Sequence, residues 1–169
     1  RRNPAAEVGP LVLDGENLIG DPTEGALIVL GAKGGLNIEE TRAALPRVAE
    51  VPFDSDYKFM ATFHEMTADD GRPVVRCYVK GAPDVVLARC GYALWHGEVV
   101  PADTVREEIL AANRQLSERG LRVLAFAARD LDDAEMTVAL ADPMAAVTDL
   151  VMVALVGIVD PLRAEAKDA

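Results

Sequence analysis

Residues 47–80 have the sequence RVAEVPFDSDYKFMATFHEMTADDGRPVVRCYVK. The apolar residues of this stretch predict three strands, over Arg47–Phe53, Lys58–Met66 and Val74–Val79. Two short polar turns separate them, at 54–56 and 68–71. Because turns this short join antiparallel neighbours, whereas a parallel crossover needs a dozen or more residues, the stretch predicts an antiparallel meander.

Helices and further strands are predicted on both sides of this meander. Before it, the pattern predicts strands over 11–13 and 17–19 around Asp14-Gly15, a helix from Asp21 or Thr23 to Gly34, and a short helix over Ile38–Leu45 capped by Asn37. After it, the pattern predicts a helix over Pro83–Arg89, a hairpin within Ala93–Val100 and the longest helix, from Asp103 or Thr104 to Gly120. A strand over Arg122–Ala128, a loop with one helical turn over Asp130–Pro143 and a strand over Leu150–Val159 are predicted to follow. The strands come mostly as hairpins with helices interspersed. We therefore predict an α+β fold, with an antiparallel twisted sheet of about six or seven strands flanked by helices.

The charge balance limits which ligands this chain attracts. The formal net charge is −11, from 17 Lys and Arg against 28 Asp and Glu. A field of that sign repels nucleic acid and anionic lipid, and it repels ATP at long range. We therefore expect no nucleic-acid partner, and any phosphate site requires a local cluster of lysine and arginine.

Cysteines and apolar runs give two further expectations. Cys77 and Cys90 form no Cys-x-x-Cys pair, so we expect reduced thiols and no zinc site. Arg1–Pro10 lacks the apolar stretch of a signal peptide. The longest apolar run, Leu150–Val159, is about half as long as a membrane helix requires. We expect that this part of the protein does not enter a membrane.

Several common catalytic signatures are absent from the sequence. It contains no Gly-x-x-x-x-Gly-Lys-Ser/Thr loop, no Gly-x-Gly-x-x-Gly after a strand, no Gly-x-Ser-x-Gly elbow and no kinase signature set. His64 and His96 are the only histidines, and their spacing is not that of metal ligands. These absences argue against a P-loop NTPase, a Rossmann cofactor site, an α/β-hydrolase and a histidine metal site.

Four segments, taken in order, resemble the nucleotide-binding domain of P-type cation-transporting ATPases. They are GDPTEGAL at 20–27, VPFDSDYK at 51–58, VKGAPD at 79–84 and RGLRVLA at 119–125. GIVDPLR at 157–163 is similar to that family's return into its phosphorylation domain. One motif alone is weak, but the ordered set covers roughly residues 11–165. The GDPTE and KGAP forms look most like the calcium-pump branch, and the His-Pro pair of heavy-metal pumps does not occur.

The resemblance implies a domain plan and a function. Residues 1–10 would be a frayed or disordered end, residues 11–159 the nucleotide-binding domain, and residues 160–169 a hinge and the truncated start of the phosphorylation domain. The domain would bind ATP, as Mg-ATP in the full-length pump, and would work with the phosphorylation and actuator domains of the same chain. It would lie on the cytoplasmic side of an integral plasma-membrane protein.

The resemblance also assigns an adenine pocket. Phe53, at a strand end beside a polar turn, would stack on adenine, a contact worth about 1–3 kcal/mol by analogy with base stacking. Glu24, in a first helical turn, would accept a hydrogen bond from the adenine amino group and so favour adenine over guanine. A favourable interaction with the helix dipole is the alternative for Glu24. Met60 would pack under the ring, although core packing explains this residue equally well.

The phosphate path is assigned in the same way. Both lysines are near strand ends: Lys58 would lie near the adenine and the phosphate path, and Lys80 would line the pocket floor. Arg122 would contact the phosphates through its planar fork. Gly81 and Ala82 would leave room for the ligand to approach the backbone. Each of these cations has a plainer alternative, a solvated surface charge. The sequence departs from the family pattern at Asp84, where Glu is usual, and at Tyr57, where Arg or Lys is usual. The change at Tyr57 removes one positive charge near the pocket, which would weaken the phosphate contacts.

The catalytic centre of the family is missing from this sequence. P-type pumps form an aspartyl-phosphate on an Asp-Lys-Thr-Gly-Thr motif, which does not occur here. Because phosphoryl transfer depends on positioning and charge neutralisation by such groups, we expect the isolated domain to be catalytically inactive. Two other functions stay open: a hydrolase of the haloacid dehalogenase type, whose Asp-x-Asp-x-Thr/Val strand is absent, and a regulatory or protein-interaction domain that has lost nucleotide binding.

Overall fold

The computed structural model describes residues 12–14, 17–19, 22–68 and 70–159. Contacts between residues divide the chain into two compact units. The smaller unit comprises residues 1–44 and 158–169, and the larger unit comprises residues 45–157. The predicted boundaries after residues 10 and 159 stay predictions, since the segments 1–11 and 160–169 lie outside the described residues.

The smaller unit contains a short hairpin and two helices. Strands β1 (Val12–Asp14) and β2 (Asn17–Ile19) pair antiparallel, and helices α1 (Pro22–Lys33) and α2 (Ile38–Ala44) follow. Asn37 caps α2 as predicted, because its Oδ1 accepts a 3.2 Å hydrogen bond from the amide of Glu40. The predicted capping residue Asp21 lies outside the described residues.

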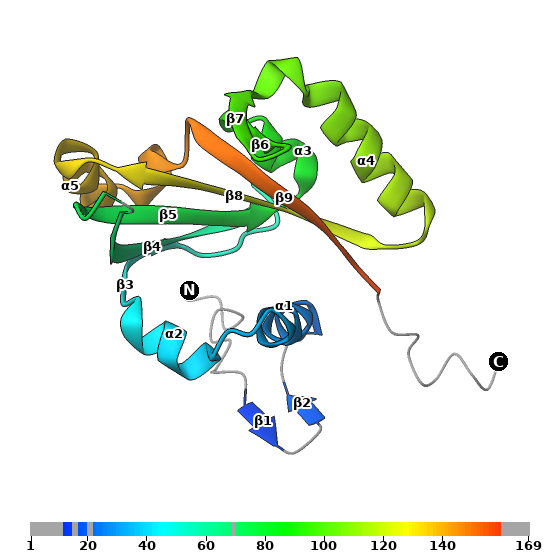
Figure 1. Cartoon of the computed structure of the whole chain (residues 1–169), viewed down its shortest axis with the longest axis horizontal. Helices are drawn as coiled ribbons and strands as arrows, with labels where there is room; N and C mark the ends of the chain where they lie inside the picture. The colour runs from blue at the N-terminus through cyan, green and yellow to red at the C-terminus, as the bar shows by residue number, and fades with distance from the viewer. Residues whose placement is uncertain (1–11, 15–16, 20–21, 69, 160–169) are drawn as a thin grey trace. The chain divides into compact units, whose positions relative to one another are not determined.

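The larger unit is built on a seven-stranded sheet (Figure 1). Its strands lie in the order β3-β4-β5-β8-β9-β6-β7. Their bounds are β3 Arg47–Val51, β4 Phe59–Thr67, β5 Pro73–Gly81, β6 Cys90–Trp95, β7 Glu98–Pro101, β8 Arg122–Leu131 and β9 Leu150–Ile158. The predicted meander is confirmed, because β3 pairs antiparallel with β4 and β4 pairs antiparallel with β5.

The predicted α+β class and strand number are also confirmed, with one difference in strand direction. β5–β8 and β6–β7 are antiparallel, but β6 and β9 pair parallel, so the sheet is mixed. More than fifty residues separate these two strands along the chain. A connection of that length permits either direction, so the prediction of antiparallel hairpins from short turns does not extend to this pair.

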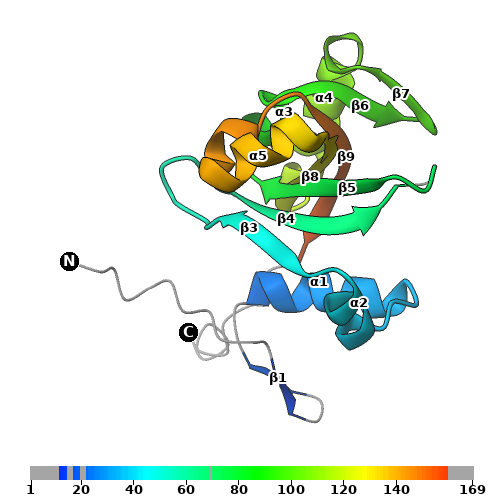
Figure 2. The ribbon, with the colours of Figure 1, turned by 90° about the vertical axis from the view of Figure 1, so that its left-hand side faces the viewer.

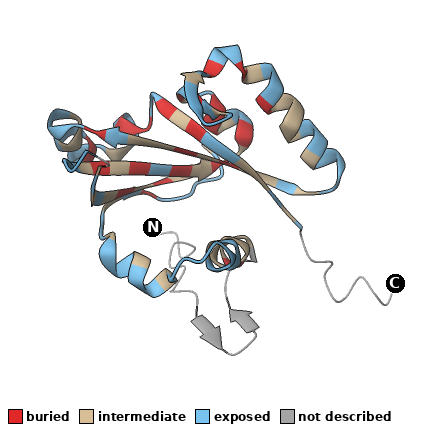
Figure 3. Ribbon diagram, viewed as in Figure 1, coloured by how far each residue is buried: buried red, intermediate tan, exposed pale blue. Residues whose placement is uncertain are grey.

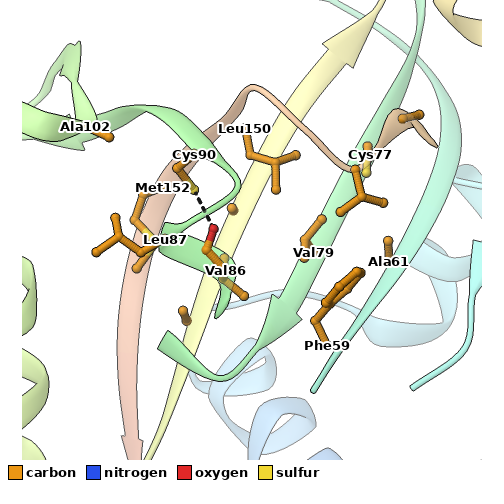
Figure 4. Packing of buried hydrophobic residues seen from close by; sticks show 14 of the residues in the cluster. Phe59, Ala61, Cys77, Val79, Val86, Leu87, Cys90, Ala102, Leu150 and Met152 are labelled. Carbon is orange, nitrogen blue, oxygen red and sulfur yellow. Dashed lines mark hydrogen bonds between the residues drawn. The ribbon is translucent and has the colours of Figure 1, made fainter. Parts of the chain in front are cut away.

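The core lies on one face of the sheet. On β4, Phe59, Ala61 and Phe63 are fully buried, and their cross-strand partners on β5 are the buried residues Gly81, Val79 and Cys77. In both views, α3 (Pro83–Leu87) and α5 (Asp133–Ala141) lie on the same side of these strands (Figures 1 and 2). Val86 and Leu87 of α3 join the buried cluster with Phe59 and Leu150 (Figure 4). Buried and more exposed residues therefore alternate along the central strands (Figure 3).

The longest helix, α4 (Arg106–Glu118), ends as the sequence predicts. Gly120 follows it with a left-handed φ of 74°, a conformation that glycine adopts without steric cost. The helix begins two or three residues later than predicted, because Ala102–Thr104 form a separate 3-10 turn, η1. Within the described residues, no helix has the length and apolar composition that crossing a bilayer requires.

The prediction of a loop with a single helical turn over 130–143 was wrong. This segment contains α5, a nine-residue helix. Asp132 and Glu135 form a reciprocal capping box: the Asp132 carboxylate accepts from the Glu135 amide at 2.8 Å, and the Glu135 carboxylate accepts from the Asp132 amide at 3.1 Å. The Asp-x-x-Glu spacing is a helix-start signal, and the acidic composition of the segment obscured it.

Both cysteines are free and buried, as expected for reduced thiols. Burial raises the pKa of the Cys77 thiol and of the Cys90 thiol from 9.0 to about 12. The Cys90 thiol also donates a hydrogen bond to the carbonyl of Val86 at 3.2 Å (Figure 4). Since the thiolate is the reactive form, both residues act as small apolar side chains in the folded protein.

We expect both thiols to resist a disulfide reagent such as DTNB in the folded chain at pH 8. With a pKa near 12, only about one thiol in ten thousand is ionised at that pH, and burial blocks access to it. Titration in denaturant should release two equivalents at once. Rapid stoichiometric reaction of either cysteine under native conditions would contradict this packing.

Candidate functional site

Three strands meet at one end of the sheet, where most of the predicted site residues lie. β4 begins there with Phe59, directly opposite Gly81 at the end of β5. Gly81 in turn lies opposite Ala125 of β8. The loop over residues 52–58, which joins β3 to β4, ends at the same place. We call this region the sheet-end site.

The loop over 52–58 is held by its own hydrogen bonds. The amide of Lys58 donates to the carbonyl of Asp54 at 2.7 Å, and the carboxylate of Asp54 accepts from the amide of Asp56 at 2.7 Å. Lys58 has a left-handed φ of 55°, which is uncommon outside glycine. Its carbonyl accepts a 3.0 Å hydrogen bond from the amide of Ala82. The second and third family-like segments are therefore joined through Lys58.

Gly81 is buried against this junction. A β-carbon built at position 81 would lie 2.5 Å from the Lys58 carbonyl oxygen, 2.5 Å from Cβ of Phe59 and 2.7 Å from Cα of Phe59. No side chain fits there, since two of the three atoms belong to the backbone. The chain itself therefore requires glycine at this position, in addition to the predicted role of admitting a ligand.

One face of the sheet-end site carries a row of candidate ligand contacts. Met60 lies opposite Lys80, and Lys80 lies opposite Phe126, so these three residues are on the same face of β4, β5 and β8. Alternation along β8 adds Leu124 and Arg122 to this face. The opposite face holds the buried residues Phe59, Gly81 and Ala125. Arg122 is about 13 Å along the strand from Phe126, at about 3.3 Å per residue.

We call Phe53, the residue predicted to stack on adenine, the adenine shelf. Its side chain lies in the loop and is 64% exposed, whereas the two phenylalanines of β4 are fully buried. An aromatic ring presented in this way can stack on a planar ligand. The two residues beside it in sequence, Pro52 and Asp54, are also exposed.

Three predicted cations lie at this end of the sheet: Lys58 directly precedes β4, Lys80 lies opposite Met60, and Arg122 begins β8. Lys58 and Arg122 are exposed and Lys80 is half-buried. Asp54 and Asp56 in the loop oppose them. Among the described residues, no group of three or more His, Cys, Asp or Glu side chains is placed to hold a metal ion.

Glu24 lies in the smaller unit, in the first turn of α1, and is half-buried. Its assignment to the adenine pocket stays a prediction. The sheet-end site contains the other seven predicted residues: Phe53, Lys58, Met60, Lys80, Gly81, Ala82 and Arg122.

The sequence analysis did not single out Phe126 and Leu124 as site residues. Both lie in a strand in which every residue from 123 to 128 is apolar, so composition does not distinguish its two faces. The register with Lys80 makes this distinction. The only sequence signal for the two faces of β8 is the alternation of side-chain size. The small alanines at 125 and 127 are buried on one face, and the larger Leu124 and Phe126 lie on the other.

Comparison with known proteins gives a consistent set of relatives. The family model described as P-type ATPase, cytoplasmic domain N, matches residues 7–165. Calcium-transporting ATPase 1 of Lactococcus lactis is 35% identical over 153 residues, covering 90% of this chain and 16% of that protein. Cation-transporting ATPase pma1 of Synechocystis is 38% identical over 150 residues, covering 88% and 15%. Probable cation-transporting ATPase F of Mycobacterium tuberculosis is 43% identical over 118 residues, covering 68% and 12%. The chain thus spans only about a sixth of the first two relatives.

We expect Gly81→Ala to destabilise the larger unit by about 1–3 kcal/mol, the usual cost of overpacking, because backbone atoms cannot move aside as a flexible side chain would. Urea denaturation followed by circular dichroism measures the change. Gly91→Ala in β6 is the matched control, since its β-carbon would meet nothing closer than 3.6 Å. Equal stability of the two variants would show that the junction is looser than described.

Proposed function

The chain belongs to the P-type cation-transporting ATPases, as their cytoplasmic domain N, and from this premise we propose that it binds ATP for the parent pump. The observation that carries the proposal is the sheet-end site, where an exposed Phe53 ring lies with Lys58, Lys80 and Arg122 in a chain of net charge −11. The domain holds the adenine and delivers the γ-phosphate to an aspartate outside these residues.

Adenine stacks on Phe53 in this proposal. A ring that is 64% exposed on an anchored loop loses little freedom when a base covers it. Met60 on β4 and Phe126 on β8, the two strands that flank β5, supply apolar surface near the same end of the sheet. In this proposal Glu24 accepts a hydrogen bond from the amino group of adenine, because a carboxylate is an acceptor and repels the carbonyl of guanine.

The triphosphate follows the cations. Lys80 lies on the same face as Met60, and Arg122 lies further along that face of β8. An arginine fork suits bidentate phosphate contacts, and lysine acts as a point charge. Without further partners we expect modest binding, on the order of millimolar to high micromolar, or about −4 to −6 kcal/mol. Magnesium would arrive with the nucleotide.

The remaining assignments concern the parent protein. The aspartyl-phosphate motif does not occur in this sequence, so the domain positions the nucleotide and other domains of the pump perform phosphoryl transfer. The phosphorylation and actuator domains are its expected partners, in a pump of the plasma membrane. Calcium is the proposed cargo, because several relatives at 35–38% identity are calcium-transporting ATPases.

We expect Phe53→Ala to weaken ATP binding about five- to a hundredfold, the range of one lost base stack. Binding is measured by titrating ATP and following amide chemical shifts. Because the ring is exposed, the free energy of unfolding should change by less than about 0.5 kcal/mol. Tyr92→Ala, which removes a 49% exposed ring from β6, is the control and should bind ATP normally. Unchanged affinity in Phe53→Ala would rule out Phe53 as the stacking residue, whereas the absence of ATP-induced shifts at Lys58 and Lys80 in the parent chain would favour a regulatory or protein-interaction domain.

We expect Lys80→Gln to weaken ATP binding about three- to tenfold and to leave adenosine binding unchanged, because one phosphate contact with a cation is lost. The ATP affinity of the variant should also depend less on salt concentration than that of the parent chain. Arg72→Gln, which removes a charge just before the opposite end of β5, is the matched control. An equal loss for ATP and adenosine would place Lys80 beside the base instead of the phosphates.

A further inference from the structure

We propose that Tyr57 is a positioning residue, which holds the loop over 52–58 in the conformation that presents Phe53 to the base. The inference rests on the proposed function for its consequence, but the anchoring itself rests on contacts within the loop. Tyr57 stands where the family resemblance leads one to expect Arg or Lys, so this chain has one positive charge fewer near the pocket and a phenol ring in its place.

The hydroxyl of Tyr57 closes the loop directly beside the shelf. It donates a 2.5 Å hydrogen bond to the carbonyl of Pro52, whose peptide bond leads into Phe53. Pro52 has no amide hydrogen, so its carbonyl is the only backbone group through which this residue can be tied by a hydrogen bond. Desolvation raises the pKa of Tyr57, and the nearby Asp54 raises it further. The hydroxyl therefore remains a donor throughout the physiological range.

On its other side, Phe53 is followed by a second anchor. The carbonyl of Asp54 accepts from the amide of Lys58, and the carboxylate of Asp54 accepts from the amide of Asp56, each at 2.7 Å. Phe53 thus lies between two tied residues, although its own ring is exposed. An exposed loop residue ordinarily keeps its conformational freedom and pays the ordering entropy on binding.

The ring of Tyr57 is itself fixed to the core. Its centroid lies 4.8 Å from that of Phe59, with the two planes inclined by 53°. Phe59 is fully buried, and the guanidinium carbon of Arg89 lies 4.6 Å from its ring centroid. The series Arg89–Phe59–Tyr57–Pro52 therefore links the shelf to the buried end of β4. A cationic side chain at position 57 can donate to a carbonyl, but it offers no aromatic ring to pack on Phe59.

The test uses Tyr57→Phe in the 169-residue chain, since this change keeps the ring and removes only the donor. We expect the dissociation constants for ATP and for adenosine to rise by the same factor, about three- to tenfold, and binding of inorganic tripolyphosphate to stay unchanged. In a Phe53→Ala background the same change should alter ATP affinity by less than about twofold, because the shelf it positions is gone. Tyr92→Phe, which removes a hydroxyl from β6, is the matched control.

A second measurement needs no nucleotide. In the ligand-free chain, the order parameter of the Phe53 amide should fall from a rigid value near 0.85 toward about 0.6 or below in Tyr57→Phe, while amides of β4 are unaffected. If the parent chain binds no ATP, the proposed function fails, and this measurement alone decides whether Tyr57 anchors the loop. Unchanged Phe53 order in Tyr57→Phe overturns the inference. It is also overturned if Phe53→Ala loses ATP affinity and Tyr57→Phe does not, or if Tyr57→Phe acts equally in both backgrounds.

Discussion

The close approach of the Lys58–Phe59 backbone to Gly81 is the constraint on which the rest of the sheet-end site depends. Because position 81 has no β-carbon, β4 and β5 meet closely enough for the Lys58 carbonyl to accept from the Ala82 amide at 3.0 Å. Lys58 ends the loop that carries Phe53, and Phe59 begins the buried face of β4. One junction therefore fixes the ring, two cations and the edge of the core relative to one another.

The cations of the sheet-end site differ in sign from the net charge of the chain. A molecule of net charge −11 repels a nucleotide at a distance, so a few cations gathered at one end of a sheet can act only at short range. Binding through short-range contacts is stronger when the contacting groups are already rigid, because ordering a mobile group on binding costs entropy. The hydrogen bonds around Phe53 and the left-handed turn at Lys58 supply that rigidity in a loop that is otherwise exposed.

Local pattern predicted most elements, and each of the two failures has a physical explanation. The meander, the end of α4 at Gly120 and the Asn37 cap follow from turn residues and alternation that act within a few positions. Helix α5 was missed, because the acidic composition of 130–143 favoured a loop while the capping spacing of Asp132 and Glu135 favoured a helix. The parallel pairing of β6 with β9 joins residues far apart in the chain, and a connection of that length permits either direction.

Ordered motifs and apolar periodicity are properties of the chain alone, and they were enough to predict the fold class, the family and seven residues that lie at one end of the sheet. The contacts in space were needed to show which of these residues share a face, that Phe126 and Leu124 lie on that face, and that a neighbouring backbone requires glycine at position 81. The structure also shows that Tyr57 does more than remove a charge, because its hydroxyl donates a hydrogen bond to the Pro52 carbonyl. Such facts depend on cross-strand register and on contacts through space, which a one-dimensional pattern does not specify.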